Sequence, residues 1–546
     1  MIYCLAVRKG GVHMTGSRMS GIVLPVSSLP GPYGIGTLGA HARKWIDFLH
    51  ESGQQVWQIL PLSPTGYGDS PYQSCSSMAG NPYLIDLDTL AAEGLLTQEE
   101  IDACDFGSDI DYVDYGLIYQ NRLPLLRKAY LRGKDNAEVL SFVKGQESWL
   151  PDYALFMALK EHYGMVQFSL WPDKDVIARD KTALRKALED HAEAVRFHAF
   201  IQYIFYKQWR DLKAYARKRG VKIMGDMPIY VAEDSAEVWA HPELFQLSGP
   251  AKPARVAGVP PDFYSATGQL WGNPLYDWAY HEKTGYKWWL SRMEQARFFY
   301  DILRIDHFRA FYNYWSVPAG AETALTGRWV NGPRLPLVEK LKMSVPYGFL
   351  VAEDLGDLGG NVRAFFRQTG LPGMKVLVYA FDPEADSEFL PHNAPRNSVS
   401  YTSTHDSSTF TDWYRNEASG GEREFAARYL RLREEEGIHW GAVCSVWNSP
   451  SRLAMAPFQD ILGLSQDARI NVPSTLGGNN WRWRVREDAL NESVSSRLLE
   501  VTKTYRRFKK PPKEEKLPVS ADKSPKEGKP PEPKETETPK DTSSRD

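Results

Sequence analysis

The chain has few cysteines, no long apolar run and almost no net charge. The four cysteines among its 546 residues are Cys4, Cys75, Cys104 and Cys444, and no two of them form a CxxC pair. This spacing disfavours a disulfide framework and a cysteine zinc site, so we expect reduced thiols and no bound metal. No run of about 18 apolar residues occurs that could cross a membrane. A net charge of −3 gives no reason to expect a nucleic acid partner.

The two ends of the sequence differ in composition from the rest. The opening "MIYCLAVRK" places its short apolar run before the charges, the reverse of a secretory signal. With the scarce cysteines, this predicts a cytoplasmic protein. We expect residues 1–17 to be a flexible extension and residues 511–546, rich in Pro, Lys and Glu, to be a disordered tail.

Aromatic residues are plentiful, at 12% of the chain. Most single aromatic side chains belong to a core in a protein of this size. Several, however, stand beside Gly, Pro, Asn and Asp in segments that read as loops, such as "PTGYGDSPYQS" and "PPDFYSATGQLWGNPLYDW". Ring faces presented by loops can stack on sugar rings or nucleic acid bases.

Apolar runs alternate with helical patterns along the middle of the chain. Helical periodicity covers residues 40–52 and 192–220, and eight apolar runs cover residues 21–26, 56–60, 221–231, 302–306, 349–353, 374–381, 398–404 and 453–462. Eight buried strands separated by helices predict an α/β fold, a (β/α)8 TIM barrel over residues 18–510, with an open doubly wound sheet as the alternative. The gaps at about 63–220 and 232–300 are too long for simple crossovers, so we expect inserted subdomains around the C-terminal face of the barrel.

One short motif suggests a different function. "GIGTLG", residues 34–39, fits the GxGxxG dinucleotide fingerprint and lies between a predicted strand and a helix. Seven residues separate it from the first strand, and the second strand ends in "QILPLSP" without the acidic residue that a ribose requires. We therefore expect these glycines to shape a turn and the protein to bind no cofactor.

Three of the predicted strands end at or near a carboxylate, namely Asp306, Glu353 and Asp406. A single acid there would be explained by helix capping or a local ion pair. Three at comparable positions favour one pocket, because the C-terminal ends of barrel strands share one rim. Paired carboxylates on either side of a bond are what glycoside cleavage requires.

The neighbours of these acids indicate different roles for them. Side chains two apart on a strand share a face, so Arg304 is expected beside Asp306, where it favours the ionised, nucleophilic form. Glu353 has no basic residue within four positions, which suits a proton donor, and a carboxylate from Asp406 would raise its proton affinity. The histidines at positions 307 and 405 would be neutral donors to sugar hydroxyls, or structural.

The blocks "RIDHFRAF", "VAEDLG" and "YTSTHD" resemble, in this order, the catalytic blocks of the 4-alpha-glucanotransferases. This family, also called amylomaltase or disproportionating enzyme, is glycoside hydrolase family 77 of the α-amylase superfamily. The further blocks "GDSPYQS", "AGNPYLIDL", "GDMPIYVAEDSAEVWAHPELF" and "GNNWRWR" extend the resemblance over about residues 18–507. It implies transfer of α-1,4-glucan segments to the 4-hydroxyl of an acceptor, with α-1,4-glucans and malto-oligosaccharides as binding partners.

The resemblance also implies roles for single residues. Asp306 corresponds to the nucleophile, Glu353 to the general acid/base and Asp406 to a third acid that grips sugar hydroxyls. The implied substrate-binding residues are Arg304, His405, Asp226, Tyr72, Trp271, Asn273 and, for a more distant stretch of glucan, Tyr67. The third block departs from the family's usual Gly-Thr-His-Asp-Asn-Asp at Ser403, Ser407 and Ser408.

Two other functions share the same residues. An α-glucan hydrolase needs the same acids and differs only in the acceptor, which is water. A catalytically silent carbohydrate-binding protein is disfavoured by the retention of all three acids. The aromatic loop at residues 258–278 favours transfer, because it could bind an acceptor and exclude water.

Removal of residues 511–546 is expected to leave catalysis and the melting temperature nearly unchanged. Leu517 and Val519 are the only sizeable apolar residues of this segment, so it can contribute little burial to a core. Thermal denaturation and turnover of maltotriose and of a long glucan, with and without the segment, check this. A loss only on the long glucan would show that the tail recruits polymer, and a large fall in melting temperature would show that it packs.

Overall fold

The computed structural model describes residues 18–66, 68–261, 265–356 and 358–508. Within these residues, eight parallel strands form the central sheet in the order β11-β8-β3-β2-β1-β14-β13-β12. Their bounds are β1 Met19–Val23, β2 Val56–Gln58, β3 Lys222–Met227, β8 Ile302–Ile305, β11 Leu350–Ala352, β12 Gly373–Val376, β13 Ser398–Tyr401 and β14 Leu453–Pro457. Every one of the eight predicted apolar runs overlaps one of these strands.

The two edge strands of this sheet approach each other, which makes it a barrel. The Ala352 N–H at the end of β11 donates to the carbonyl of Pro372, just before β12, over 2.9 Å. The strands also follow one another around the sheet in sequence order, without the reversal that an open doubly wound sheet has. The predicted (β/α)8 barrel is therefore confirmed, and the open-sheet alternative is wrong.

Two of the predicted apolar runs continue into helical turns after their strands end. The run at 453–462 divides at Pro457 into β14 and the short helix α18 (Phe458–Leu462), because proline has no N–H to continue the strand ladder. The run at 374–381 turns into a 3₁₀ turn at Leu377–Tyr379 after β12. Residues 377–397, all of them described, contain no α-helix, so this crossover between β12 and β13 departs from the ideal barrel.

Helices surround the strands. The predicted helices at 40–52 and 192–220 are observed as α1 (Ala40–Glu51) and α9 (Ala192–Lys218), and Gly220, with φ of 74°, follows the end of α9. The other helices between or after barrel strands are α12 (Lys287–Phe299), α13 (Arg334–Ser344), α14 (Gly360–Thr369), α15 (Phe410–Asp412), α16 (Gly420–Leu430), α17 (Ile438–Asn448) and α19 (Glu492–Thr504).

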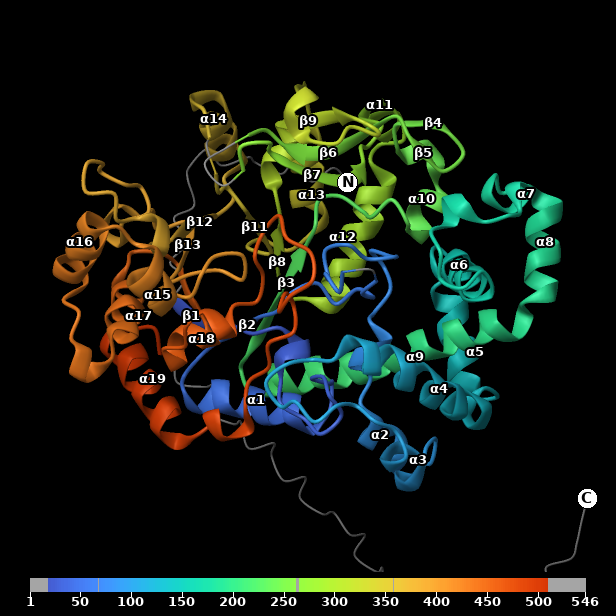
Figure 1. Cartoon of the computed structure of the whole chain (residues 1–546), viewed down its shortest axis with the longest axis horizontal. Coiled ribbons are helices and arrows are strands. Elements are labelled where there is room, and N and C mark those ends of the chain that lie inside the picture. Colours follow the sequence, from blue (N-terminus) through green and yellow to red (C-terminus); the bar gives the residue numbers. More distant parts are fainter. Residues whose placement is uncertain (1–17, 67, 262–264, 357, 509–546) are drawn as a thin grey trace, which may run out of the picture. The chain divides into compact units, whose positions relative to one another are not determined.

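The first long insertion is helical and lies between β2 and α9. Figure 1 shows α4 to α8 gathered at the right of the barrel strands. Its helices are α2 (Leu87–Ala92), α3 (Gln98–Asp102), α4 (Tyr115–Gly133), α5 (Ala137–Gly145), α6 (Leu150–His162), α7 (Lys174–Ile177) and α8 (Lys181–Asp190). Several of these helices begin at a residue whose side chain accepts a hydrogen bond from an N–H group of the first turn. Asp86, Asp114 and Asp180 are examples.

The second insertion contributes to a small antiparallel sheet above the barrel, which Figure 1 shows at β6, β7 and β9. Among the described residues this sheet has the order β10-β9-β6-β7. Its strands are β6 (Arg255–Val259), β7 (Gln269–Pro274), β9 (Asn313–Pro318) and β10 (Arg328–Asn331), and the same insertion carries α10 (Ala236–Ala240), β4 (Leu247–Gly249), β5 (Lys252–Pro253) and α11 (Trp278–Lys283). β6 and β7 precede β8 in the sequence, whereas β9 and β10 follow it. The connections before and after β8 therefore both contribute to this sheet.

The glycine motif at residues 34–39 forms a turn, as expected. Gly34 has φ of 72°, and a side chain at Gly36 would collide with the Val26 carbonyl. A side chain at Gly39 would collide with the carboxylate of Asp86. The turn packs so closely against the rest of the protein that only glycine fits at positions 36 and 39.

No described helix is long and apolar enough to span a membrane.

Candidate active site

A groove of about 640 Å³ opens at the C-terminal ends of the barrel strands. Asp306, directly after β8, and Asp406, shortly after β13, both line it. Glu353 follows β11 and is more buried, with 9% of its surface exposed. Other lining residues come from the loops and the small sheet and include Tyr72, Trp271, Asn273, His307, Asn471 and Trp481. The strand ends thus bring together the predicted acids.

Arg304 occupies the position that the strand periodicity predicts. Its Nη2 lies 2.9 Å from Asp306 Oδ1, and its Nη1 lies 2.5 Å from Asp226 Oδ2 in the neighbouring strand β3. Burial raises the pKa of Asp306 to about 6, and the positive charge of Arg304 opposes this rise. Arg304 thus keeps Asp306 ionised at neutral pH in a site whose burial favours the protonated acid.

Glu353 is held by two backbone N–H groups. The N–H of His307 donates to Oε2 over 2.8 Å, and the N–H of Leu355 donates to Oε1 over 2.6 Å. Burial raises the pKa of Glu353 to about 8, and the nearby charge of Asp306 adds to the rise while Arg304 opposes it. On the sequence alone, Asp406 is the carboxylate expected to raise the pKa of Glu353. In the structure, Asp306 has this effect. Glu353 therefore retains its proton at neutral pH.

Asp406 is fixed by residues that the sequence analysis missed. Asn471 Nδ2 donates to its Oδ1 over 2.7 Å, and Arg469 Nη2 donates to its backbone carbonyl over 3.0 Å. His405 Nε2 lies 3.3 Å from the other carboxylate oxygen. The Asn471 N–H also donates to the His405 carbonyl over 3.1 Å. Asn471 belongs to the segment "INVPST", residues 470–475, and sequence spacing does not predict its contact with Asp406, because the two residues are 65 positions apart.

The three serines that depart from the family pattern all have structural partners. Ser403 Oγ donates to buried Asp460 over 2.6 Å, and Ser407 Oγ accepts from the Thr404 N–H over 2.9 Å. Ser408 Oγ accepts from Arg469 Nη1 over 2.6 Å. These serines therefore hold the turn that carries Asp406.

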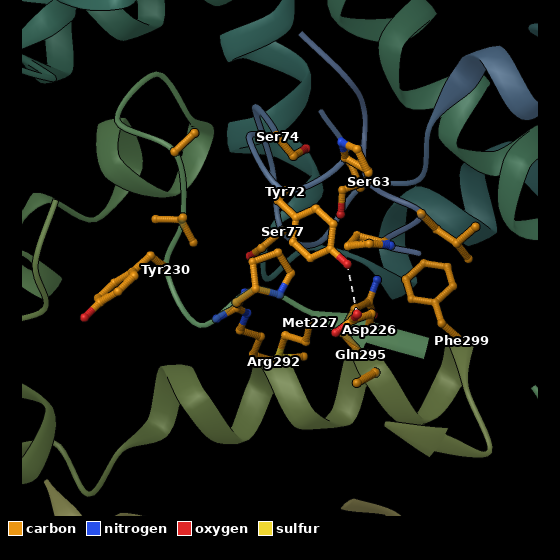
Figure 2. A pocket seen from close by; sticks show the side chains of 18 of the residues that line it. Ser63, Tyr72, Ser74, Ser77, Asp226, Met227, Tyr230, Arg292, Gln295 and Phe299 are labelled. Carbon is orange, nitrogen blue, oxygen red and sulfur yellow. Dashed lines mark hydrogen bonds between the residues drawn. The ribbon is translucent and has the colours of Figure 1, made fainter. Parts of the chain in front are cut away.

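Figure 2 shows Tyr72 above Asp226, joined by a hydrogen bond. Tyr72 Oη donates to Asp226 Oδ2 over 2.9 Å and lies 2.8 Å from His405 Nε2, and the Tyr72 and His405 rings stack with centroids 5.4 Å apart. The Asp226 side chain is fully buried and Arg304 is nearly so. The charged groups of Asp226 and Arg304 meet each other, and they also contact Tyr72 and Asp306. Substrate binding by these two residues stays a prediction.

The other predicted binding residues lie on the groove wall. The Trp271 ring lines the groove and contacts the ring of His307, with centroids 4.8 Å apart and planes at 87°. Asn273 donates from Nδ2 to the Val231 carbonyl over 2.8 Å and accepts from Gln73, so its amide also braces the wall. Tyr67 lies outside the described residues, as do residues 262–264 of the aromatic loop.

His307 is half-buried in the groove wall, and desolvation together with the charge of Arg309 lowers its pKa to about 4. The imidazole is therefore neutral at pH 7, as expected. Among the described residues no cluster of three or more His, Cys, Asp or Glu side chains is arranged to hold a metal ion.

A (β/α)8 barrel with one ionised and one protonated carboxyl group at neighbouring strand ends has the chemical groups of an enzyme that cleaves glycosidic bonds. Comparison with known proteins gives the family. The sequence model of the 4-alpha-glucanotransferase family matches residues 24–490, and the chain belongs to this family of enzymes.

The similarity extends over almost the whole of each relative. The chain is 48% identical over 494 residues to a 4-alpha-glucanotransferase of Streptococcus pneumoniae serotype 4, covering 90% of this chain and 98% of the relative. It is 47% identical to that of Thermus thermophilus, over 88% and 97%. A solved amylomaltase of Streptococcus agalactiae in complex with acarbose superposes with a TM-score of 0.88 at 39% identity, covering 90% of this chain and 100% of the other.

Proposed function

We propose that this enzyme transfers a segment of an α-1,4-glucan to the 4-hydroxyl of an acceptor glucose or glucan, with retention of configuration. The observation that carries the proposal is the contrast between the two carboxyl groups. Asp306 is paired with Arg304 at 2.9 Å, whereas burial and the nearby charge of Asp306 raise the pKa of Glu353, which keeps its proton. Asp306 can therefore attack the anomeric carbon, and Glu353 can protonate the leaving oxygen.

In the first half-reaction, a carboxylate oxygen of Asp306 forms a bond to the anomeric carbon. The bond from that carbon to the leaving 4-oxygen breaks, and Glu353 gives this oxygen its proton. The product is a glucosyl ester on Asp306 with inverted configuration. Arg304 would keep its ion pair with Asp226, lose the charge of Asp306 and interact with the ester.

In the second half-reaction, an acceptor 4-hydroxyl attacks the same carbon. Glu353, now ionised, takes the hydroxyl proton, and the ester bond breaks to restore the Asp306 carboxylate. Two inversions give net retention. One α-1,4 bond is exchanged for another, so no external energy source is required.

The remaining groove residues would bind sugar. Asp406, fixed through one oxygen by Asn471, has its second oxygen near His405 and 42% of its side chain exposed, so it can accept from sugar hydroxyls. Trp271 and Tyr72 present ring surface to the groove. Tyr67 would contact a more distant stretch of glucan. We also propose a cytoplasmic enzyme, which cell fractionation with activity measurements would test.

Incubation with maltotriose tests the transfer reaction. We expect a ladder of shorter and longer malto-oligosaccharides while the number of reducing ends stays constant, because each transfer consumes and creates one. A rising number of reducing ends would identify a hydrolase. Absence of any product would identify a binding protein.

The pH dependence of kcat/KM should be bell-shaped. The Asp306 and Glu353 pair titrates with apparent pKa values of about 6 and about 8. Activity should rise as the pH passes about 6, when Asp306 ionises, and fall above about 8, when Glu353 loses its proton. Initial rates on maltotriose over roughly pH 4 to 10 check this. A profile without an alkaline limb would contradict the assignment of Glu353 as the acid.

A further inference from the structure

His307 has a left-handed backbone conformation, with φ of 48° and ψ of 44°. It stands between Asp306 and the 3₁₀ turn at Phe308–Phe311. This region is disfavoured for residues with a Cβ atom, although His, Asn and Asp enter it more readily than others. A backbone of this kind beside the reacting groups calls for a physical reason.

The direction of the His307 N–H supplies that reason. It donates to Glu353 Oε2 over 2.8 Å, while the Leu355 N–H holds the other oxygen. The backbone is anchored before and after His307. The Asp306 N–H donates to the Met227 carbonyl over 2.9 Å, and the Ala310 N–H donates to the His307 carbonyl over 3.0 Å, next to the fully buried Phe308. With both flanks fixed, the dihedral angles of His307 decide where its N–H points.

The ring of His307 connects the same residue to the groove wall. It meets the Trp271 ring of β7 edge-on, at 4.8 Å and 87°. The imidazole is neutral, so this contact is between uncharged rings. One residue thus contacts both the general acid, through its backbone, and the sugar-facing wall, through its side chain.

We propose that His307 is a positioning residue for Glu353, and that its left-handed backbone, rather than proton transfer by its imidazole, is what the reaction requires. The proposal rests on the proposed function, since it assumes that Glu353 is the general acid. The N–H of His307 and that of Leu355 together fix the carboxyl group, and the hydrogen bonds of the backbone before and after His307 hold it in place.

Four substitutions at position 307 distinguish a requirement for the left-handed backbone from a requirement for the imidazole ring. His307→Gly and His307→Asn remove the imidazole but accept the left-handed conformation, so we expect kcat within about threefold of the wild type. His307→Ala and His307→Val also remove it but resist that conformation, and we expect losses of about 10-fold and about 100-fold, the size that a 1 Å misplacement produces. Equal loss in the Gly and Val variants would overturn the proposal, because the ring would then be the needed group.

A second readout shows whether the effect passes through Glu353. Fluoride leaves α-maltosyl fluoride without protonation, so single-turnover fluoride release by His307→Val should fall less than about threefold while maltotriose cleavage falls about 100-fold. Equal losses on both donors would contradict a role through the acid. Melting temperatures confirm folding, and a wild type that fails to disproportionate maltotriose would instead refute the proposed function.

Discussion

Asp306→Asn is expected to lower turnover of maltotriose by about 10⁴-fold or more while glucan binding survives. The amide keeps the shape of the carboxylate and loses the nucleophile. Burial disfavours the ionised side chain, as the pKa of about 6 shows, so the neutral amide should leave the melting temperature unchanged or slightly higher. Rate measurements check the loss of turnover, isothermal titration with maltotriose checks the retained binding, and thermal denaturation checks the melting temperature.

Asp301→Asn provides a matched control. Asp301 lies at the opposite end of the same strand, where its Oδ2 accepts from the Ile223 N–H over 3.1 Å. The same chemical change there removes a charge from β8 without touching the groove, so turnover should be retained. If Asp306→Asn turns over at the wild-type rate, Asp306 is not the nucleophile.

Glu353→Gln is expected to lower maltotriose cleavage by about 10³-fold, within the range for loss of a general acid. The amide cannot donate the proton that the leaving 4-oxygen needs. Release of fluoride from α-maltosyl fluoride needs no such proton, so the first half-reaction with this donor should survive much better. Single-turnover measurements with both donors give the comparison.

Glu339→Gln, on the exposed side of α13, is the control for a Glu to Gln change and should behave as wild type. Were fluoride release lost as completely as maltotriose cleavage, Glu353 would have another role than proton donation. The alkaline limb of the pH profile should also disappear in Glu353→Gln, since the group that titrates at about 8 is gone.

Features that depend on local periodicity could be predicted from the sequence. The eight strands follow from short apolar runs between helical patterns, and strand-end acids meet because parallel strands end on one rim. The contact between Arg304 and Asp306 follows from their spacing of two along β8. These inferences need no knowledge of which distant segments pack together.

Features that depend on packing between distant segments could not be predicted. The contact of Asn471 with Asp406 joins loops 65 residues apart, and β9 and β10 complete a sheet begun by an earlier insertion. The burial of Asp226 follows from Tyr72, which comes from a loop 154 residues earlier. The left-handed backbone of His307 has no signature in the sequence, because His adopts ordinary conformations in most positions.

The central claim is that a glucosyl group becomes covalently bound to Asp306. Trapping of that ester tests it most directly. Glu353→Gln, which lacks the base for the second half-reaction, is incubated with α-maltosyl fluoride, digested with a protease and measured by mass spectrometry. The account predicts that the peptide containing Asp306 gains the mass of one maltosyl group, with that mass located on Asp306. A maltosyl group on another carboxylate, or no adduct on any peptide while fluoride is released, would contradict it.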